Sequence, residues 1–525
     1  MKRIENSPTL EKGKQGFFSV VFGRTFVVFV LLLLQIILML WGLIRLTEVW
    51  YAFSGVMTVM AVILVVHLIN KPENPAYKIT WIVLILALPI FGASLYLFVE
   101  TQPATKWINA RLQKLHGEMR GEWKQDEEVV QHLEEENPHM ANIGRYMAEC
   151  GGYPVYENSS AKYFPTGQDK FEELKAQLLK AEKFIFMEYF IVAKGYMWDS
   201  VLEILKHKVQ EGVEVRFLYD GTNMVSRLPY HYPKELQSFG IQCRIFAPVK
   251  PAVSTRQNNR DHRKIVVIDG KTAFTGGINL ADEYINQKER FGYWKDTAIM
   301  VQGEAVRSFT MMFLEMWNAE QYNVTEDFGK YLNVPVHRHP VSGDGFVIPY
   351  GDSPLDTENV GEEVYMDILN TAQNYVHIMT PYLILDNEML TALKFAAKRG
   401  VEVKIIMPHI PDKKYAFVLA KTYYNELLDS GVQIYEFEPG FVHAKVFVSD
   451  DEKAVVGTIN LDYRSLYLHF ECAVMLYRNA EIPMVERDFQ ETLKQCITVT
   501  KDDYKKQKLF DKIEGKVLRL MAPLM

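Results

Sequence analysis

Cysteine is scarce in this chain of 525 residues, and its four cysteines lie far apart. They are Cys150, Cys243, Cys472 and Cys496. No two of them form a CxxC pair, so the sequence contains neither a disulfide framework nor a recognisable zinc site. A basic surplus is also missing, because 58 lysines and arginines stand against 65 acidic residues, a net charge of −7. This balance argues against a general nucleic-acid-binding protein, which would be expected to carry excess positive charge.

The composition also lacks the marks of a disordered or fibrous protein. Hydrophobic residues make up 48% of the chain and charged residues 23%, which excludes disorder, collagen and coiled coil as its main state. The length corresponds to roughly three to four domains' worth of chain.

Charge is absent from three long segments near the N-terminus. The segments 25–44, 49–70 and 79–99 contain no charged residue, and each is long enough as a helix to cross a hydrocarbon layer of about 30 Å. Tryptophan and tyrosine lie near their ends, as in an aromatic belt. We therefore expect residues 1–105 to form a membrane anchor with two or three transmembrane helices. The alternative is a soluble domain of buried helices, and the membrane side of the remaining chain stays open.

The rest of the chain is acidic and polar, with 50 basic and 60 acidic residues beyond position 105. Residues 106–145 are rich in charge and predict a juxtamembrane helical linker. At the other end, 501–525 predict a C-terminal amphipathic helix. Its apolar residues fall near one helical face: Leu509, Phe510, Ile513, Val517 and Leu520. This helix either lies at a lipid interface or packs on the protein.

The polar body repeats itself. A β-rich run at 183–192, a helical pattern and a second β-rich run at 212–219 recur as 375–384, a helical pattern and 400–407. Such alternation predicts an α/β fold with buried sheets flanked by helices. The period of about 190 residues predicts two tandem domains related by a pseudo-twofold axis, over 146–335 and 336–500.

One chemical pattern occurs at the same place in both copies. Histidine, lysine, aspartate, glycine and asparagine recur with a constant offset of 181 residues. The matched residues are His262, Lys264, Asp269, Gly276 and Asn279 in the first copy, and His443, Lys445, Asp450, Gly457 and Asn460 in the second. A chance match of histidine, lysine and aspartate at this spacing would occur about 0.05 times in a chain of this composition.

The spacing predicts a shared site for a phosphodiester anion. Residues two apart in a strand point to the same side, so His262 and Lys264 point together, as do His443 and Lys445. Lysine ammonium groups, with Asn279 and Asn460, would stabilise the phosphate oxygens. One imidazole would attack phosphorus while the other protonates the leaving oxygen. The lysines supply the positive charge, so we expect neither metal nor cofactor.

The carboxylates divide into two groups. Asp269 and Asp450 belong to the repeated motif and are taken with its catalytic residues, but their odd spacing from the histidines favours a role in organising a hairpin turn. Asp296 and Glu471 are the candidates for orienting the imidazoles, since a histidine needs a partner on its second nitrogen to fix its tautomer. They lie 34 and 28 residues after the histidine of their own copy.

These motifs resemble the phospholipase D superfamily, whose members carry two H-x-K-x-x-x-x-D motifs, and more closely the bacterial cardiolipin synthases. The stretches that carry the closer likeness are 258–270, 276–284, 293–297, 380–382, 457–471 and 517–525. The resemblance extends over roughly 49–525. Thr458 stands where the family usually has serine and His469 where it usually has asparagine, and the run 25–44 is extra.

The resemblance implies phosphatidyl transfer between two phosphatidylglycerols in the bacterial cell membrane, giving cardiolipin and glycerol. By analogy His262 is the nucleophile and His443 the acid and base, with carboxylates matching Asp296 and Glu471 in support. A phospholipase D hydrolase is the alternative with the same chemistry. A nuclease of the superfamily and an inactive membrane scaffold are less consistent with the apolar N-terminus and the intact paired motifs. The oligomeric state is not fixed by the sequence.

Overall fold

The computed structural model describes residues 33–34, 37, 47–100, 103–121, 125–249, 259–321, 326–335, 345–355 and 358–524. The chain divides into two compact units. The first comprises Met1–Trp107, Val249–Gln257 and Leu524, and the second nearly all the rest. Most of the first predicted spanning segment, 25–44, lies outside the described residues.

The described part of the first unit contains three apolar helices. They are α3 (Thr47–Ile69), α4 (Pro75–Ala87) and α5 (Pro89–Glu100). Asn74 caps α4 by accepting from the backbone N–H of Ala76, and Pro75 fits the first turn, where its missing N–H costs nothing. The second predicted segment, 49–70, falls largely within α3.

The third predicted segment, 79–99, is not one helix. Leu88, which ends α4, has φ −137° and ψ 72°, and Pro89 begins α5. The chain then doubles back, so that the rings of Trp81 and Tyr96 meet edge to face at 5.4 Å and Lys71 pairs with Glu100 at 2.6 Å. The expectation of a single spanning helix here is wrong. In the described part of the chain, no helix combines the length and apolar character that a membrane crossing requires.

The second unit begins with helices that precede the two repeats. They are α6 (Pro103–Gly121), α7 (Glu127–Glu136), α8 (Pro138–Tyr146) and the π-helix η1 (Met147–Gly151). Within the described part of the charged linker predicted over 106–145, all residues except 125, 126 and 137 are helical. Asp126 and Asn137 cap α7 and α8 with their side-chain oxygens.

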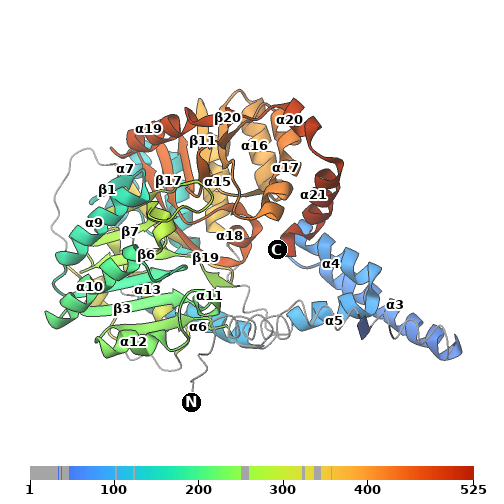
Figure 1. Ribbon diagram of the computed structural model, residues 1–525, viewed down its shortest axis with the longest axis horizontal. Coiled ribbons are helices and arrows are strands. Elements are labelled where there is room, and N and C mark those ends of the chain that lie inside the picture. Colours follow the sequence, from blue (N-terminus) through green and yellow to red (C-terminus); the bar gives the residue numbers. More distant parts are fainter. Residues whose placement is uncertain are drawn as a thin grey trace, which may run out of the picture. The chain divides into compact units, whose positions relative to one another are not determined.

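The first repeat forms a mixed seven-stranded sheet in the order β1-β9-β7-β6-β2-β3-β4. The strands are β1 (Ser159–Phe164), β2 (Phe184–Tyr189), β3 (Glu214–Asp220), β4 (Gln242–Phe246), β6 (Lys264–Ile268), β7 (Thr272–Gly276) and β9 (Ala298–Gly303). The helices are α9 (Gly167–Leu179), α10 (Tyr196–Gln210), α11 (Asn223–Ser226), α12 (Tyr232–Ser238), α13 (Val306–Asn318), α14 (Gly329–Leu332) and the 3-10 turn η3 (Asp282–Ile285). Every residue of β2 is buried, because helices such as α10 and α13 cover the sheet (Figure 1).

The second repeat has the same strand order with one strand added, β10-β19-β17-β16-β11-β13-β14-β20. The strands are β10 (Phe346–Asp352), β11 (Tyr375–Met379), β13 (Glu402–Pro408), β14 (Gln433–Phe437), β16 (Val446–Ser449), β17 (Lys453–Gly457), β19 (His469–Tyr477) and β20 (Cys496–Thr498). The helices are α15 (Val360–Thr371), α16 (Asn387–Lys398), α17 (Lys414–Asp429), α18 (Tyr463–Tyr467), α19 (Ile482–Leu493), α20 (Lys501–Lys506), α21 (Leu509–Met521) and the 3-10 turn η4 (Ala522–Leu524). The matching orders confirm the predicted duplication and the mixed α/β class, and the runs at 183–192 and 375–384 supply the central strands β2 and β11.

Short strands join the two repeats. They are β5 (Arg260–Asp261), β8 (Tyr293–Lys295) and β15 (Gly440–Val442), with β12 (Leu383–Ile384) and β18 (Leu461–Asp462) pairing within the second repeat. Strand β5 pairs with β19 of the other repeat, and β8 pairs with β15 of the other repeat. These two exchanges position the candidate site.

Candidate active site

Each motif histidine follows directly from one of the exchanged strands. His262 follows β5, and its backbone N–H donates to the Phe470 carbonyl at 2.9 Å. His443 follows β15, and its backbone N–H donates to the Lys295 carbonyl at 2.7 Å. The residues just after Phe470 and Lys295 are Glu471 and Asp296. The backbone therefore places each histidine beside a carboxylate of the other repeat.

The imidazole–carboxylate pairs are crossed between the repeats. His262 Nδ1 lies 2.9 Å from both carboxylate oxygens of Glu471, and His443 Nδ1 lies 2.7 Å from Oδ2 of Asp296. A carboxylate accepts a hydrogen bond from Nδ1–H, which leaves the Nε2 lone pair of each neutral ring available for chemistry. The sequence identified all four residues but could not assign the partners.

The carboxylates are themselves held in different ways. The hydroxyl of Thr458 donates to Glu471, so the departure from serine keeps the hydroxyl bond. The position of Thr458 corresponds to Gly277 in the first repeat, where an added Cβ would lie 2.0 Å from Oδ1 of Asp296. Glycine is therefore required there to admit the shorter carboxylate. Asp296 also accepts from the backbone N–H of Thr297 at 2.9 Å.

The lysines are buried beside their histidines. The ammonium of Lys264 donates to the backbone carbonyl of His262 at 2.5 Å, and Lys445 makes the same bond to the carbonyl of His443. Lys264 also lies over the ring of Phe190 at 5.4 Å. Each lysine side chain thus points to the same side of the chain as its histidine, as the spacing of two predicts.

The amides of the two asparagines already have protein partners. Asn279 accepts from the backbone N–H of Ile191 and donates to the hydroxyl of Tyr284, both at 2.8 Å. Asn460 donates to the hydroxyl of Ser465 at 2.9 Å, while its buried Oδ1 has no hydrogen-bond partner among the described residues. Their contact with phosphate remains a prediction.

Burial controls the protonation of these groups. Burial, reinforced by Lys264, Lys445 and His443, lowers the pKa of His262 well below its usual value. Burial and Lys445 lower the pKa of His443 to about 4. Burial also lowers the pKa of Lys264 to about 8 and that of Lys445 to about 7. The influence of the second repeat's cations on His262 shows that both motifs contribute to one electrostatic environment.

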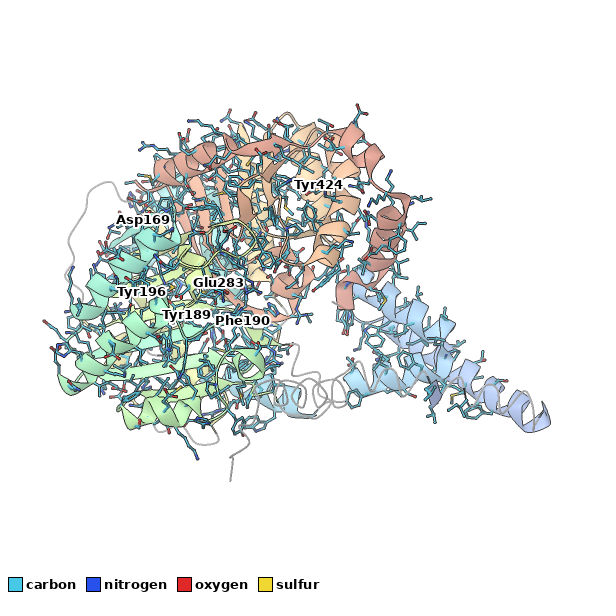
Figure 2. All side chains as sticks on the ribbon, in the orientation of Figure 1. Asp169, Tyr189, Phe190, Tyr196, Glu283 and Tyr424 are labelled. Atoms are coloured by element: carbon cyan, nitrogen blue, oxygen red, sulfur yellow. The ribbon has the colours of Figure 1, made fainter. Side chains whose placement is uncertain are left out.

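Aromatic rings line the two histidines, although none of them was singled out as a site residue from the sequence. Phe190, labelled in Figure 2, follows β2 and meets His262 edge to face at 4.8 Å between ring centroids. Tyr284 and Trp294 lie 5.6 and 5.3 Å from His443. The strand ends that carry the motif could have indicated Phe190, because it follows a central strand directly.

His469 adds a further imidazole to the site. Its ring centroid lies 5.4 Å from that of His262, and Arg464 donates to its Nε2 at 3.3 Å. Burial lowers the pKa of His469 to about 3, so the ring is neutral.

Among the described residues, His262, His469 and Glu471 form a group whose donor atoms lie within 4.8 Å of one another, a spacing that a metal ion could use. The set would suit zinc, but Glu471 already accepts from His262 and Thr458.

Asp269 and Asp450 lie in turns, which is the role that their odd spacing from the histidines favoured. The Asp269 carboxylate accepts from the backbone N–H groups of residues 182, 183 and 184 at 2.7–2.8 Å. Asp450 accepts from those of residues 373, 374 and 375 at 2.7–2.9 Å. Both have φ 54°, as hairpin turns between β6 and β7 and between β16 and β17 require. They tie the hairpin to the start of the central strand.

Replacing Asp269 with alanine is expected to lower the free energy of unfolding by about 3 kcal/mol, because three backbone N–H groups lose their acceptor. Thermal unfolding of the purified protein in detergent measures this, with Asp269→Asn as the graded control that keeps one acceptor oxygen. Turnover per folded molecule should stay close to that of the unsubstituted protein. If the variant had normal stability but no turnover, Asp269 would instead have a catalytic role.

Comparison with known proteins identifies the family. The family model described as the cardiolipin synthase PLD-like domain matches residues 174–317 and 365–493, and the phospholipase D-nuclease N-terminal model matches 59–100. The chain belongs to the cardiolipin synthase family of the phospholipase D superfamily. This confirms the resemblance seen in the motifs and, with it, the class of phosphatidyl-transferring enzymes.

Named members of the cardiolipin synthase family match nearly the whole chain. Cardiolipin synthase of Geobacillus kaustophilus is 34% identical over 490 residues, covering 90% of this chain and 94% of its own. That of Alkalihalophilus pseudofirmus is 31% identical over 477 residues, covering 90% and 93%. An uncharacterized protein of Streptococcus mutans is 54% identical over 461 residues, covering 88% and 99%.

A solved structure of the same fold is that of a phosphatidylserine synthase from Haemophilus influenzae. It matches with a TM-score of 0.54 at 14% sequence identity, covering 73% of this chain and 98% of the other. At this identity the match shows the fold alone.

Proposed function

We propose that this cardiolipin synthase family member joins two phosphatidylglycerol molecules into cardiolipin and releases glycerol. The observation that carries the proposal is the crossed pair of histidines, each held by a carboxylate of the other repeat and each beside a buried lysine. The names of the relatives supply the substrate class. The two repeats act together as domains 146–335 and 336–500, and neither holds a complete set of groups alone.

The first step transfers a phosphatidyl group to the protein. Nε2 of His262 attacks phosphorus of one phosphatidylglycerol, and a nitrogen–phosphorus bond forms while the bond to the glycerol oxygen breaks. For this step His443 carries a second proton, on Nε2, which the bound phosphate anion favours; it gives that proton to the glycerol oxygen, and glycerol leaves. Lys264 and Lys445 stabilise the charge on the phosphate oxygens as it develops.

The second step uses the same groups in reverse. The free hydroxyl of a second phosphatidylglycerol gives its proton to His443, attacks phosphorus and displaces His262. Water in place of this hydroxyl would give phosphatidic acid, the product of a phospholipase D hydrolase. The choice between the two reactions is therefore a choice of acceptor at one covalent intermediate.

We further propose that the protein works at the bacterial cell membrane through its N-terminal unit. Large apolar side chains of α3 are exposed on it, among them Val56 at 63%, Val59 at 61% and Ile63 at 62%. Burial of these side chains in an apolar environment is favourable by about 25 cal/mol for each Å² of apolar surface removed from water.

Labelled phosphatidylglycerol in vesicles containing the full chain tests the reaction. We expect labelled cardiolipin and free glycerol in equal amounts. Phosphatidic acid as sole lipid product would establish hydrolysis instead, and no change in the lipid would reject both reactions. The doubly substituted variant His262→Ala/His443→Ala serves as the blank.

The rate should fall on the alkaline side of neutrality. Lys445 and Lys264, with pKa values of about 7 and about 8, attract the phosphate only while protonated, so kcat/KM declines as pH rises through this window. Measurement of kcat/KM from about pH 5.5 to 9.5 checks this. Lys445→Arg keeps its charge throughout and should move the decline toward the pKa of Lys264.

The control for the pH profile is Lys494→Arg, at the residue that directly follows α19, whose side chain is 68% exposed. It should leave the decline in place. A kcat/KM that stays constant to the alkaline end would contradict the proposed role of the lysines.

A further inference from the structure

The apolar side of the C-terminal helix α21 faces away from the protein. Gly515 packs on α17, where an added Cβ would lie 2.6 Å from the Thr422 side chain. At 3.6 residues per turn, Ile513 and Val517 point roughly 160° away from Gly515. They are 55% and 60% exposed, because nothing in the described unit covers that side.

The exposed face of α21 is a continuous stripe. Its members are Leu509, Phe510, Ile513, Val517, Leu520 and Met521, all exposed. Leu509 and Phe510 are 73% and 74% exposed, values that a side chain packed on the protein does not have. The sequence left open whether this helix packs on the protein or lies at a lipid interface. In the structure a narrow face around Gly515 packs on α17, while the apolar face stays exposed.

The charges of α21 fit an anionic surface. Between Lys508 and Met521 the chain carries four basic and two acidic residues. The basic ones are Lys508, Lys512, Lys516 and Arg519. Arg519 lies over the ring of Tyr423 at 4.3 Å. A helix with an exposed apolar face and basic flanks binds in the plane of an anionic bilayer, with the apolar side buried about 5–10 Å.

The end of α21 also leads toward the candidate active site. Ala522 lines a hollow of about 40 Å³ together with Tyr382, Lys413, Asp462 and Arg464. Arg464 donates to His469, which stands beside His262. The residue that ends α21 therefore shares a small hollow with Arg464, whose hydrogen-bond partner His469 lies beside the catalytic histidine.

We propose that α21 docks on the surface of an anionic lipid bilayer, with its apolar stripe in the headgroup region, and so brings the active-site side of the second unit to its lipid substrate. This contact is separate from the N-terminal helices. The lipid nature of the substrate rests on the proposed function, but the docking itself does not depend on catalysis.

Fluorescence of a single label in proteoliposomes of the full chain tests the docking. A polarity-sensitive dye is attached to Ile513→Cys in a Cys150→Ser/Cys496→Ser background, which leaves only the two buried native cysteines, in vesicles of phosphatidylglycerol or of phosphatidylcholine. We expect spin-labelled lipid to quench this dye at least twofold more than the same dye on Phe395→Cys, an apolar residue of α16 that is 54% exposed. The difference should be larger in the anionic vesicles.

A second variant connects docking to turnover. Ile513→Glu/Val517→Glu should lower the rate on vesicle substrate about tenfold, because charged groups oppose insertion. It should leave the rate on a soluble short-chain substrate unchanged, whereas Phe395→Glu should change neither. The quenching result stands even if the product is not cardiolipin, so the two proposals fail separately. Equal quenching at positions 513 and 395, or disulfide-linked dimers of Ile513→Cys that form without lipid, would overturn the docking proposal.

Discussion

Replacing His262 with alanine is expected to reduce cardiolipin formation by about 10⁴-fold or more, since the covalent step then has no nucleophile. The ring is held by Glu471 at 2.9 Å from Nδ1, so Nε2 is the atom presented to phosphorus. Replacing His443 is expected to reduce turnover on phosphatidylglycerol by a similar factor, because a glycerol oxygen leaves poorly without a proton.

An activated substrate separates the two roles. Phosphatidyl-p-nitrophenol has a leaving group that departs without a proton, so His443→Ala should release one equivalent of nitrophenolate in a burst and retain the phosphatidyl group on His262. His262→Ala should give no burst. Mass spectrometry of protein quenched in alkali, where phosphohistidine survives, locates the modified residue.

The control for these variants is His207→Ala on α10, whose side chain is 61% exposed and far from the motif in the sequence. It should behave as the unsubstituted protein. A burst in His262→Ala with none in His443→Ala would exchange the roles of the two histidines. Normal turnover in either variant would reject the shared site.

The repeated histidines and lysines of the site could be predicted from the sequence, because the spacing that identifies them is local. A histidine and a lysine two residues apart point to one side in any extended segment, and the constant offset of 181 residues indicated two equivalent copies. The same parity argument favoured a turn role for Asp269, which its three backbone bonds now explain. Local periodicity also predicted the strands β2, β3, β11 and β13.

Information that depends on distant pairing was not available from the sequence. The exchange of β5 and β15 between repeats involves strands of two and three residues, too short for a hydrophobic pattern. The assignment of Glu471 to His262 follows from that exchange. Likewise, the apolar run 79–99 continues through Pro89, so hydropathy alone does not reveal the point at which the chain turns back.

The crossed pairing makes a prediction that pairing within each copy does not. Glu471→Gln should abolish the nitrophenolate burst, because His262 loses the acceptor that fixes its tautomer; loss of the equivalent carboxylate in a serine protease lowers kcat about 10⁴-fold, and we expect about 10³-fold here. Asp296→Asn should keep the burst and lose turnover on phosphatidylglycerol, because it acts on His443.

The matched control for both carboxylate variants is Glu486→Gln. Glu486 accepts from Nδ1 of the buried His377 at 3.0 Å, so it repeats the imidazole–carboxylate pair outside the motif. Its loss should alter neither burst nor turnover. If Asp296→Asn abolished the burst and Glu471→Gln retained it, each carboxylate would serve the histidine of its own copy. The exchanged strands place the carbonyls of Phe470 and Lys295 on the backbone N–H groups of His262 and His443, and this arrangement requires the crossed result.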